Sequence, residues 1–350
     1  VMSNLTKKIG KKQAKDTYPY DENLNNSKLP FQKLDFKVIQ NLSYYKNNQE
    51  ILQKFYKSYD LKKLDRAENC AKFVSLSHLE HIETLDRKVV IDEIHTCNLR
   101  FCCLCSWRRQ QKFSIITYNT IKELQETMKL RFLFLTLTVK NPLLSDLKEN
   151  IKHMQKSFKR MVETKAWKNS ILGYCRVFEI TKPKCSKQKE NIHPHFHVLL
   201  AVKTTYFKSS SDLYLKKDDF AMMWQKALRV DYKPVCDVRI IKDRVRDGLI
   251  IEDNVAAIAE LIKYPLKDSD LSKFTTNEFK ILDKQMAGVR AINYGGILKE
   301  ANKKLSEDID IDESSLEMWR EIEKILMMYQ KEHKKHIAMR SNVRGELSKI

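Results

Sequence analysis

The stretch HPHFHVLLAV (residues 193–202) places three of the chain's nine histidines at alternate positions: His193, His195 and His197. Side chains two apart in a β-strand share one face, so His195 and His197 would present their imidazoles side by side. That spacing suits a single divalent cation, while the residues between them would point into the core. His193 faces the same way but stands at the entrance of the strand, before a proline, and is the weaker candidate.

A carboxylate on a neighbouring strand would complete such a site. Glu179 lies inside the otherwise apolar stretch YCRVFEIT (174–181), which we expect to pair with the histidine strand. Burying an unpaired carboxylate is costly, so Glu179 requires a cation. Two imidazoles and one carboxylate leave positions open for phosphate oxygens and water, which suits Mn²⁺ or Mg²⁺. A histidine pair on a strand is more often structural, and Glu179 shifts the balance towards a metal site.

A second motif, ELIKYPLKD (260–268), offers a nucleophile. Glu260 and Tyr264 are four residues apart, so they would share one face of a helix. Lys263 and Lys267 flank the tyrosine, and a nearby cation would favour the phenolate of a group whose pKa is ordinarily about 10. Tyr264 alone is an ordinary tyrosine; together with the metal strand it becomes a candidate for phosphoryl transfer.

A third motif, CNLRFCCLCSWRRQQK, holds four cysteines within nine residues: Cys97, Cys102, Cys103 and Cys105. The Cys-x-x-Cys pair Cys102 and Cys105 suits tetrahedral zinc, and Cys97 is a good third ligand. The fourth ligand is open between Cys70 and His95, and we favour Cys70 because full thiolate sets are common in closed structural sites. The alternative, a set of free buried cysteines, is disfavoured by the density of the cluster.

Within this cluster Cys103 is a spare, and the three remaining cysteines are isolated packing residues. Arg108 and Arg109 follow the cluster and would lie against phosphates, where basic side chains provide affinity that falls with salt. The whole chain of 350 residues carries 65 Lys and Arg against 45 Asp and Glu, a net charge of +20. Such a charge usually indicates a polyanionic partner, most often nucleic acid.

Composition also excludes several classes of protein. Hydrophobic residues make up 42% of the chain, which indicates a globular protein. There is no apolar run near the ~18–20 residues needed to span a bilayer, and the basic first residues lack the hydrophobic region of a secretory signal. We therefore expect a cytoplasmic protein without a membrane partner, in which cysteines are thiols or metal ligands rather than disulfides.

Hydrophobic periodicity predicts the elements that must position these motifs. The expected helices are 113–130, 147–167, 217–228, 252–266 and about 315–337, and the expected strands are 131–139, 174–181, 195–202 and 236–242. The order does not alternate strictly, so we expect an α+β fold with a mostly antiparallel sheet and helices on one face. The last helix is predicted from a capping box at Ser314 and an apolar stripe that includes Trp319 and Leu326.

Taken together, the motifs resemble the rolling-circle replication initiator (Rep) proteins of small bacterial plasmids, in the HUH endonuclease superfamily. The matching stretches occur in the family's order: CNLRFCCLCSWRR, FLFLTLTVKN (132–141), HPHFHVLLAVK and AELIKYPLKDSD (259–270). The resemblance covers roughly residues 65–300. One departure is Cys103, where the family usually has proline; the candidate ligands are intact.

The resemblance implies a concrete mechanism. Tyr264 would match the nucleophile that cuts one strand at the double-strand origin, giving a 5′-phosphotyrosine and a free 3′-OH. His195 and His197, with Glu179, would match the ligands of the catalytic metal. Glu260 would match the acid that activates water for termination in the branch with a single catalytic tyrosine. Origin DNA, a host helicase and a single-strand-binding protein would be partners, and the oligomeric state, including a homo-oligomer, is open.

The expected architecture is a central antiparallel sheet of HUH type with packed helices, an N-terminal zinc-binding segment and a helical C-terminal tail. We expect a polar arm at 1–64, the zinc-binding segment at 65–112, the nicking domain at 113–300 and the helical tail at 301–350. An HUH transposase is the nearest alternative, although many of those carry two tyrosines on one helix. From another class, a zinc-dependent DNA-binding regulator without catalysis would explain the charge and the cysteines but not the metal strand and tyrosine motif.

Overall fold

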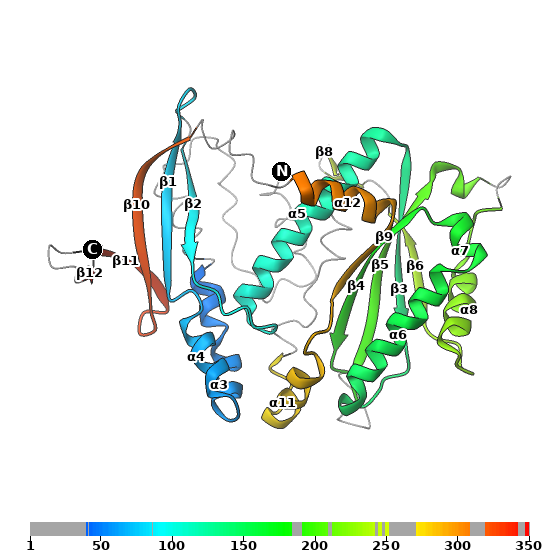
Figure 1. Cartoon of the computed structure of the whole chain (residues 1–350), viewed down its shortest axis with the longest axis horizontal. Coiled ribbons are helices and arrows are strands. Elements are labelled where there is room, and N and C mark those ends of the chain that lie inside the picture. The colour runs from blue at the N-terminus through cyan, green and yellow to red at the C-terminus, as the bar shows by residue number, and fades with distance from the viewer. Residues whose placement is uncertain are drawn as a thin grey trace. The chain divides into compact units, whose positions relative to one another are not determined.

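The computed structural model describes residues 40, 42–85, 87–183, 191–208, 212–241, 244–246, 249–251, 271–308, 319–341 and 347–349. The chain divides into two compact units, Val1–Arg108 with Asp310–Ile350 and Arg109–Ile309. Each unit is built on its own five-stranded sheet, and all neighbouring strands in both sheets are antiparallel (Figure 1). The predicted α+β class with antiparallel pairing is therefore confirmed.

In the first unit, two strands from the N-terminal third of the chain and three from its C-terminal part form one sheet of order β12-β11-β10-β1-β2. Its elements are α3 (Glu50–Lys57), α4 (Leu61–Asn69), β1 (Phe73–His81), β2 (Arg87–Ile94), β10 (Trp319–Gln330), β11 (Lys335–Ser341) and β12 (Leu347–Lys349). The β1–β2 hairpin, which is inserted between Cys70 and Cys97, was not among the elements predicted from the sequence. Long-range pairing of β1 with β10 makes the C-terminal residues part of this unit.

The helix predicted at about 315–337 is wrong, because residues 319–330 form strand β10 and 335–341 form strand β11. Strand β10 lies in the middle of the sheet, where Met327 pairs with Val74 of β1 and with Ala338 of β11. Its backbone groups therefore have ladder partners on both sides, and Met327 is buried. The apolar residues of this stretch are spaced as in a helix, but pairing with the distant strands β1 and β11 makes it a strand.

The second unit has a sheet of order β6-β3-β5-β4-β9. Its elements are β3 (Leu130–Thr138), η1 (Leu144–Asp146), α6 (Leu147–Val162), α7 (Lys165–Ser170), β4 (Gly173–Thr181), β5 (His193–Lys203), η2 (Thr204–Phe207), α8 (Lys217–Leu228), β6 (Cys236–Ile240), the hairpin β7 (Arg244–Arg246) and β8 (Leu249–Ile251), α11 (Thr276–Gln285), β9 (Ile292–Gly296) and α12 (Ile297–Asp308). Helix α5 (Cys103–Thr127) begins in the first unit and continues into the second.

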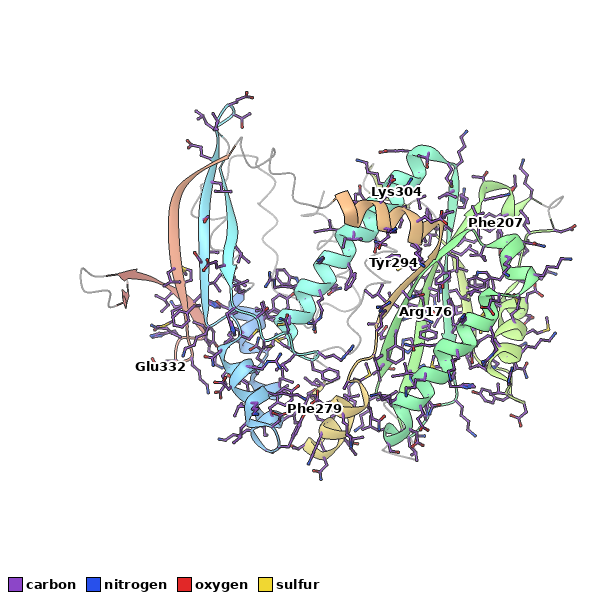
Figure 2. All side chains as sticks on the ribbon, viewed as in Figure 1. Arg176, Phe207, Phe279, Tyr294, Lys304 and Glu332 are labelled. Atoms are coloured by element: carbon purple, nitrogen blue, oxygen red, sulfur yellow. The ribbon has the colours of Figure 1, made fainter. Side chains whose placement is uncertain are left out.

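Helices α6, α7 and α8 cover one face of this sheet (Figure 1). The Phe158 ring of α6 meets Tyr174 and Phe196 edge to face, at centroid distances of 5.0 and 5.9 Å. On α8, the Trp224 indole donates a hydrogen bond to the Thr138 carbonyl at 2.8 Å. Arg176 also lies in this layer, with its guanidinium 4.4 Å from the Phe196 ring centroid (Figure 2).

Helices α5 and α12 pack on the opposite face, so the expectation of helices on one face is wrong. Ile121 of α5 and Leu298 of α12 share an aliphatic core with Val177 and Leu199 of the sheet. The physical reason is the composition of the central strands, which are apolar on both faces and therefore need two covering layers. Gly296, whose φ of +57° favours glycine, lets β9 turn directly into α12.

Most of the other predicted elements of the second unit are confirmed within three residues at their ends, except that α5 begins at Cys103, ten residues before the predicted start. These are the helices that became α5, α6 with α7, and α8, and the strands that became β3, β4, β5 and β6. The helix predicted at 252–266 lies outside the described residues. Within the described part of the chain, the helices lack either the length or the apolar character required to span a bilayer.

Candidate active site

The pairing of strands β4 and β5 assembles the candidate metal site. Glu179 is directly opposite His195 in the register, and His197 is opposite Val177, one step further along the same face. Cys175, Val177 and Glu179 alternate along β4, so the site continues the row of side chains that forms the core beneath α5 and α12. The structure brings together the carboxylate and the two imidazoles that the sequence selects.

The geometry of these three side chains is compact. The Glu179 Oε2 atom lies 2.9 Å from His197 Nε2 and 3.4 Å from His195 Nε2. One ligand atom from each residue falls within 4.8 Å of the others, and the side chains are 6–13% exposed. Atoms this close, from two imidazoles and one carboxylate, can bind one divalent ion and leave positions open to a substrate. The donor set therefore fits a divalent metal ion.

The opposite nitrogens of the imidazoles have partners that fix the rings. His197 Nδ1 lies 3.2 Å from the Thr136 hydroxyl of β3, and His195 Nδ1 lies 3.3 Å from the His193 carbonyl. Second partners of this kind orient ligand histidines and direct Nε2 to the metal. His193 itself lies 2.6 Å from Asn141 Oδ1 through its Nδ1, and the structure leaves it outside the triad.

The electrostatics favour a charged carboxylate at the site. Burial alone would raise the pKa of Glu179, but hydrogen bonds from His195 and His197 outweigh it and hold that pKa well below its usual range. Burial and the neighbouring His195 lower the pKa of His193. A carboxylate that stays ionised is an anionic ligand for a cation, which would replace the protons that the imidazole Nε2 atoms donate to it.

The cysteine cluster lies in the first unit, where four segments bring their thiols to one point. Cys70 ends α4, Cys97 follows β2, Cys102 precedes α5 and Cys105 lies in its first turn. Sγ–Sγ distances are 3.7 Å for Cys70 to Cys102, 3.7 Å for Cys70 to Cys105 and 3.6 Å for Cys97 to Cys105. Four sulfurs at 2.3 Å from a tetrahedral zinc would be about 3.8 Å apart, so the cluster fits that ion.

Neighbouring groups complete the surroundings of the cysteine cluster. The Gln49 amide donates to Cys102 Sγ at 3.2 Å, and the Cys97 backbone N–H donates to Cys70 Sγ at 3.4 Å. The buried ammonium of Lys46 donates to the carbonyls of Glu68 and Cys70, at 2.5 and 2.6 Å. Hydrogen bonds from the other three thiols hold the pKa of Cys70 far below its usual range, which favours a thiolate.

Cys103, which was expected to be a spare, and His95, the alternative fourth ligand, both lie outside the cluster. The Cys103 thiol points away and donates to the Tyr45 carbonyl at 2.8 Å. His95 lies 3.3 Å from the Asn69 carbonyl through Nδ1 and is absent from the group of four. The geometry therefore favours Cys70 over His95 as the fourth donor.

The remaining sequence-selected residues divide into two sets. Arg108 is exposed and Arg109 half-buried at the start of α5, next to Trp107, whose ring stacks on Tyr45 at 5.0 Å. The tyrosine-motif residues lie outside the described residues: Glu260, Lys263, Tyr264 and Lys267.

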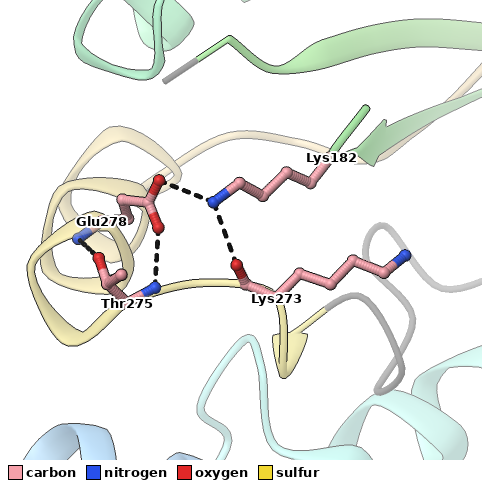
Figure 3. Close-up of polar contacts among 4 residues, drawn as sticks. All are labelled: Lys182, Lys273, Thr275 and Glu278. Carbon is pink, nitrogen blue, oxygen red and sulfur yellow. Dashed lines mark hydrogen bonds and ion pairs between the residues drawn. The ribbon is translucent and has the colours of Figure 1, made fainter. Parts of the chain in front are cut away.

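A contact that the sequence analysis missed joins β4 to the segment that follows the tyrosine motif. Lys182 donates to Glu278 Oε1 at 2.7 Å and to the Lys273 carbonyl at 3.1 Å (Figure 3). Glu278 in turn accepts from the Thr275 backbone N–H at 2.7 Å in a capping box. The T-x-x-E pattern of residues 275–278 was the available signal. This contact holds the segment after the tyrosine motif to Lys182, which follows Glu179 by three residues in the sequence.

Comparison with known proteins gives consistent matches. A sequence model described as "Replication protein" matches residues 88–342. A "Protein rep" of Bacillus amyloliquefaciens is 35% identical over 259 residues, which cover 70% of this chain and 74% of the relative. A "Protein rep" of Lactiplantibacillus plantarum is 39% identical over 222 residues, which cover 61% and 68%. No solved structure matches the chain.

The family match extends over more than half of the chain, and it includes the candidate metal strand and three of the four cysteines. The chain therefore belongs to the Rep family of replication proteins, the plasmid replication initiators that its ordered motifs resemble.

Proposed function

We propose that this protein initiates rolling-circle replication by cutting one strand of the plasmid's double-strand origin and remaining attached to the 5′ end. The observation that carries the proposal is the meeting of Glu179, His195 and His197 within 4.8 Å in a member of the Rep family. A divalent ion bound there, Mn²⁺ or Mg²⁺, would polarise the scissile phosphate as a Lewis acid and template. The buried carboxylate and the fixed imidazoles support that role.

In the proposed cleavage the Tyr264 phenol is the nucleophile. Its oxygen bonds to phosphorus, its proton passes to solvent, and the bond from phosphorus to the 3′ oxygen breaks. The leaving oxygen takes up a proton and becomes the 3′-OH from which a polymerase extends. Lys267 favours the phenolate, while Lys263 contacts the DNA backbone, because cations stabilise both kinds of negative charge.

Termination is proposed to use Glu260, one helical turn before Tyr264 in the sequence. As a general base it would take a proton from a water molecule, and that water would attack a phosphate at the end of the replication cycle. The hydrolysis leaves a 5′-phosphate on the DNA and a free tyrosine, so atoms balance without a further reactant. Proximity of the acid and the phenol would let both act on the same phosphate in turn.

The cysteine cluster is proposed to hold a structural Zn²⁺ with four thiolate ligands: Cys70, Cys97, Cys102 and Cys105. Its closed, fully buried donor set offers no open position for substrate, which supports a structural role rather than a catalytic one. Zinc there would fix the start of α5, from which Arg108 and Arg109 would reach the DNA phosphates. A host helicase and a single-strand-binding protein are the proposed partners during strand displacement.

A nicking and attachment assay tests the proposal. Wild-type protein with Mn²⁺ should convert supercoiled plasmid carrying its own replicon to open circles, and the adduct peptide should contain Tyr264. Tyr264→Phe should retain DNA binding but give no adduct, and a plasmid without the replicon should stay supercoiled. Adduct formation at wild-type levels by Tyr264→Phe would remove that residue as nucleophile, and no nicking at all by the wild type would favour a non-catalytic regulator.

A further inference from the structure

A cluster of aromatic side chains lies beyond the end of β5 that is remote from the histidines. The Phe207 ring is 4.9 Å from Tyr206 and 6.1 Å from Tyr214, and Tyr206 and Tyr214 are 5.5 Å apart. Tyr206 is fully buried, whereas Tyr214 is 50% exposed. Figure 2 labels Phe207 at this edge of the unit. We call Phe207 and Tyr214, with the basic residues beside them, the Phe207 patch.

The exposed ring of the patch is held in place rather than loosely attached. The Tyr206 hydroxyl donates to the Leu215 carbonyl at 3.2 Å and accepts from the Leu215 backbone N–H at 3.0 Å. Burial raises the pKa of Tyr206 to about 12, so the hydroxyl keeps its proton and can donate as well as accept. A pair of bonds to the residue next to Tyr214 fixes the backbone from which that ring projects.

The segments that carry or adjoin these rings are rich in exposed cations. Six exposed basic residues lie there: Lys129, Arg131, Lys203, Lys208, Lys216 and Lys217. The Arg131 guanidinium lies 5.8 Å from the Phe207 ring centroid, a cation–π arrangement. The same segments carry three acidic residues, Asp212, Asp218 and Asp219, and Asp218 pairs with Lys233 at 2.8 Å. The patch therefore carries an excess of positive charge.

The position of the patch separates it from the candidate metal site. His195 is near the start of β5 and Lys203 is its last residue, eight positions along the strand (203 − 195). At roughly 3.3 Å per residue, the two ends are about 26 Å apart. A ligand bound at the patch would therefore contact the protein well away from the triad of Glu179, His195 and His197.

We propose that the Phe207 patch binds single-stranded DNA about 26 Å along β5 from the candidate metal site, as a second binding surface of the same unit. The proposal rests on the proposed function, which makes single-stranded origin DNA the substrate. Two features select this ligand. Accessible aromatic faces stack on unpaired bases of any sequence, and flanking lysines and arginine neutralise the backbone. An acidic peptide would use the charges but would leave the rings without a stacking partner.

Binding of fluorescein-labelled oligo(dT) of 30 nucleotides, measured by anisotropy with the full chain in the absence of Mn²⁺, tests the patch. Tyr214→Leu keeps an apolar side chain against Tyr206 but removes the aromatic face, and it should weaken binding at least about fivefold. Tyr214→Phe is the matched control and should bind like the wild type. The Arg131→Gln and Lys203→Gln double variant should lower the salt slope of log Kd by about 0.7 for each DNA phosphate that it no longer neutralises.

Equal affinity of wild type and Tyr214→Leu for oligo(dT), with both folded by circular dichroism, would overturn the proposal. The proposal would also be overturned if Tyr214→Leu weakened the binding of a 30-base-pair duplex but not of oligo(dT), because the patch would then bind duplex DNA. The binding assay needs no cleavage, so Tyr264→Phe should show the same dependence on Tyr214. Failure of the nicking mechanism and failure of the patch therefore give different results.

Discussion

The Nε2 atom of His197 lies 2.9 Å from Oε2 of Glu179, although 18 residues separate the two in sequence. The contact exists because β4 and β5 pair antiparallel with Glu179 opposite His195, so a one-residue slip would send the carboxylate to the opposite face. The candidate metal site therefore depends on strand register as much as on the residues themselves.

Removal of this carboxylate should strongly reduce metal-dependent nicking while leaving the fold intact. Glu179→Gln keeps the volume and a hydrogen-bonding side chain but removes the anionic ligand. We expect Mn²⁺ binding by isothermal titration to weaken strongly, and nicking at fixed Mn²⁺ to fall about 100-fold or more, since a Lewis acid supplies several kcal/mol to the transition state.

The control for that variant is His153→Ala, a histidine on α6 whose Nε2 lies 3.0 Å from the Leu228 carbonyl, on the other face of the sheet. It should keep Mn²⁺ affinity and nicking close to the wild type. Zinc content should stay the same in both variants. A Glu179→Gln protein that binds Mn²⁺ as tightly as the wild type would remove Glu179 from the ligand set.

Substitution of one thiol in the cysteine cluster should release zinc. Cys102→Ser removes the sulfur that lies 3.7 Å from Cys70 and accepts from Gln49. Structural zinc contributes directly to folding, so the variant should lose bound metal and unfold at a lower temperature. Zinc per chain by elemental analysis, together with thermal unfolding, measures both effects.

Cys103→Ser is the matched control because it replaces the adjacent thiol, which donates to the Tyr45 carbonyl instead of joining the cluster. It should retain zinc and change stability only slightly. If Cys103→Ser lost zinc while Cys102→Ser kept it, the ligand set would have to be reassigned.

Much of the sheet that carries the candidate site could be predicted from sequence, because its signals are local. The alternation of His195 and His197 identified a shared face, and the stretch 195–202 was correctly predicted as a strand. The thiol spacing of Cys102 and Cys105 was likewise local. Each of these inferences needed only the period of a single element.

What the sequence could not reveal depends on contacts between distant segments. Met327 pairs with Val74 across 253 positions (327 − 74), and that pairing turned an expected helix into strand β10. The β1–β2 hairpin, by contrast, was missed although it has local strand signals: Val74 and Leu76 alternate with serines in β1, and an apolar run follows Lys88 in β2. Lys46 and Lys182 are lysines like many others in the sequence, and only the fold shows which carbonyls and carboxylates they meet.

The Lys46 ammonium should stabilise the metal-bound form of the cysteine cluster. Its side chain is 5% exposed and donates to the Cys70 carbonyl, and a Zn²⁺ with four thiolates carries a net charge of −2. Burial lowers the pKa of Lys46, while the charges of the nearby thiols raise it. Lys46→Met should weaken zinc retention about 10- to 100-fold in competition with a chelator. The exposed helix residue Lys54, changed to Met, should have no effect.

The ion pair between Lys182 and Glu278 predicts a defined pH dependence of stability. Burial would raise the pKa of Glu278, but the hydrogen bonds from Lys182 and from Thr275 outweigh it and lower that pKa. A folded-state pKa below the unfolded value means that the carboxylate stabilises the fold above about pH 4.5. This contribution is lost as the pH falls through the folded-state pKa.

Glu278→Gln should therefore lower the free energy of unfolding by about 1 kcal/mol at pH 7. The difference from the wild type should shrink as the pH is lowered below about 4, because the wild-type carboxyl then becomes neutral as well. Urea unfolding at pH 7, 5 and 3.5 measures it. A Lys182→Met variant should show the same trend, and the double variant should be less destabilised than the sum of the two because they share one interaction. A difference that grows towards low pH would contradict the sign of the Glu278 shift, since only a raised pKa makes a carboxyl group more stabilising when protonated.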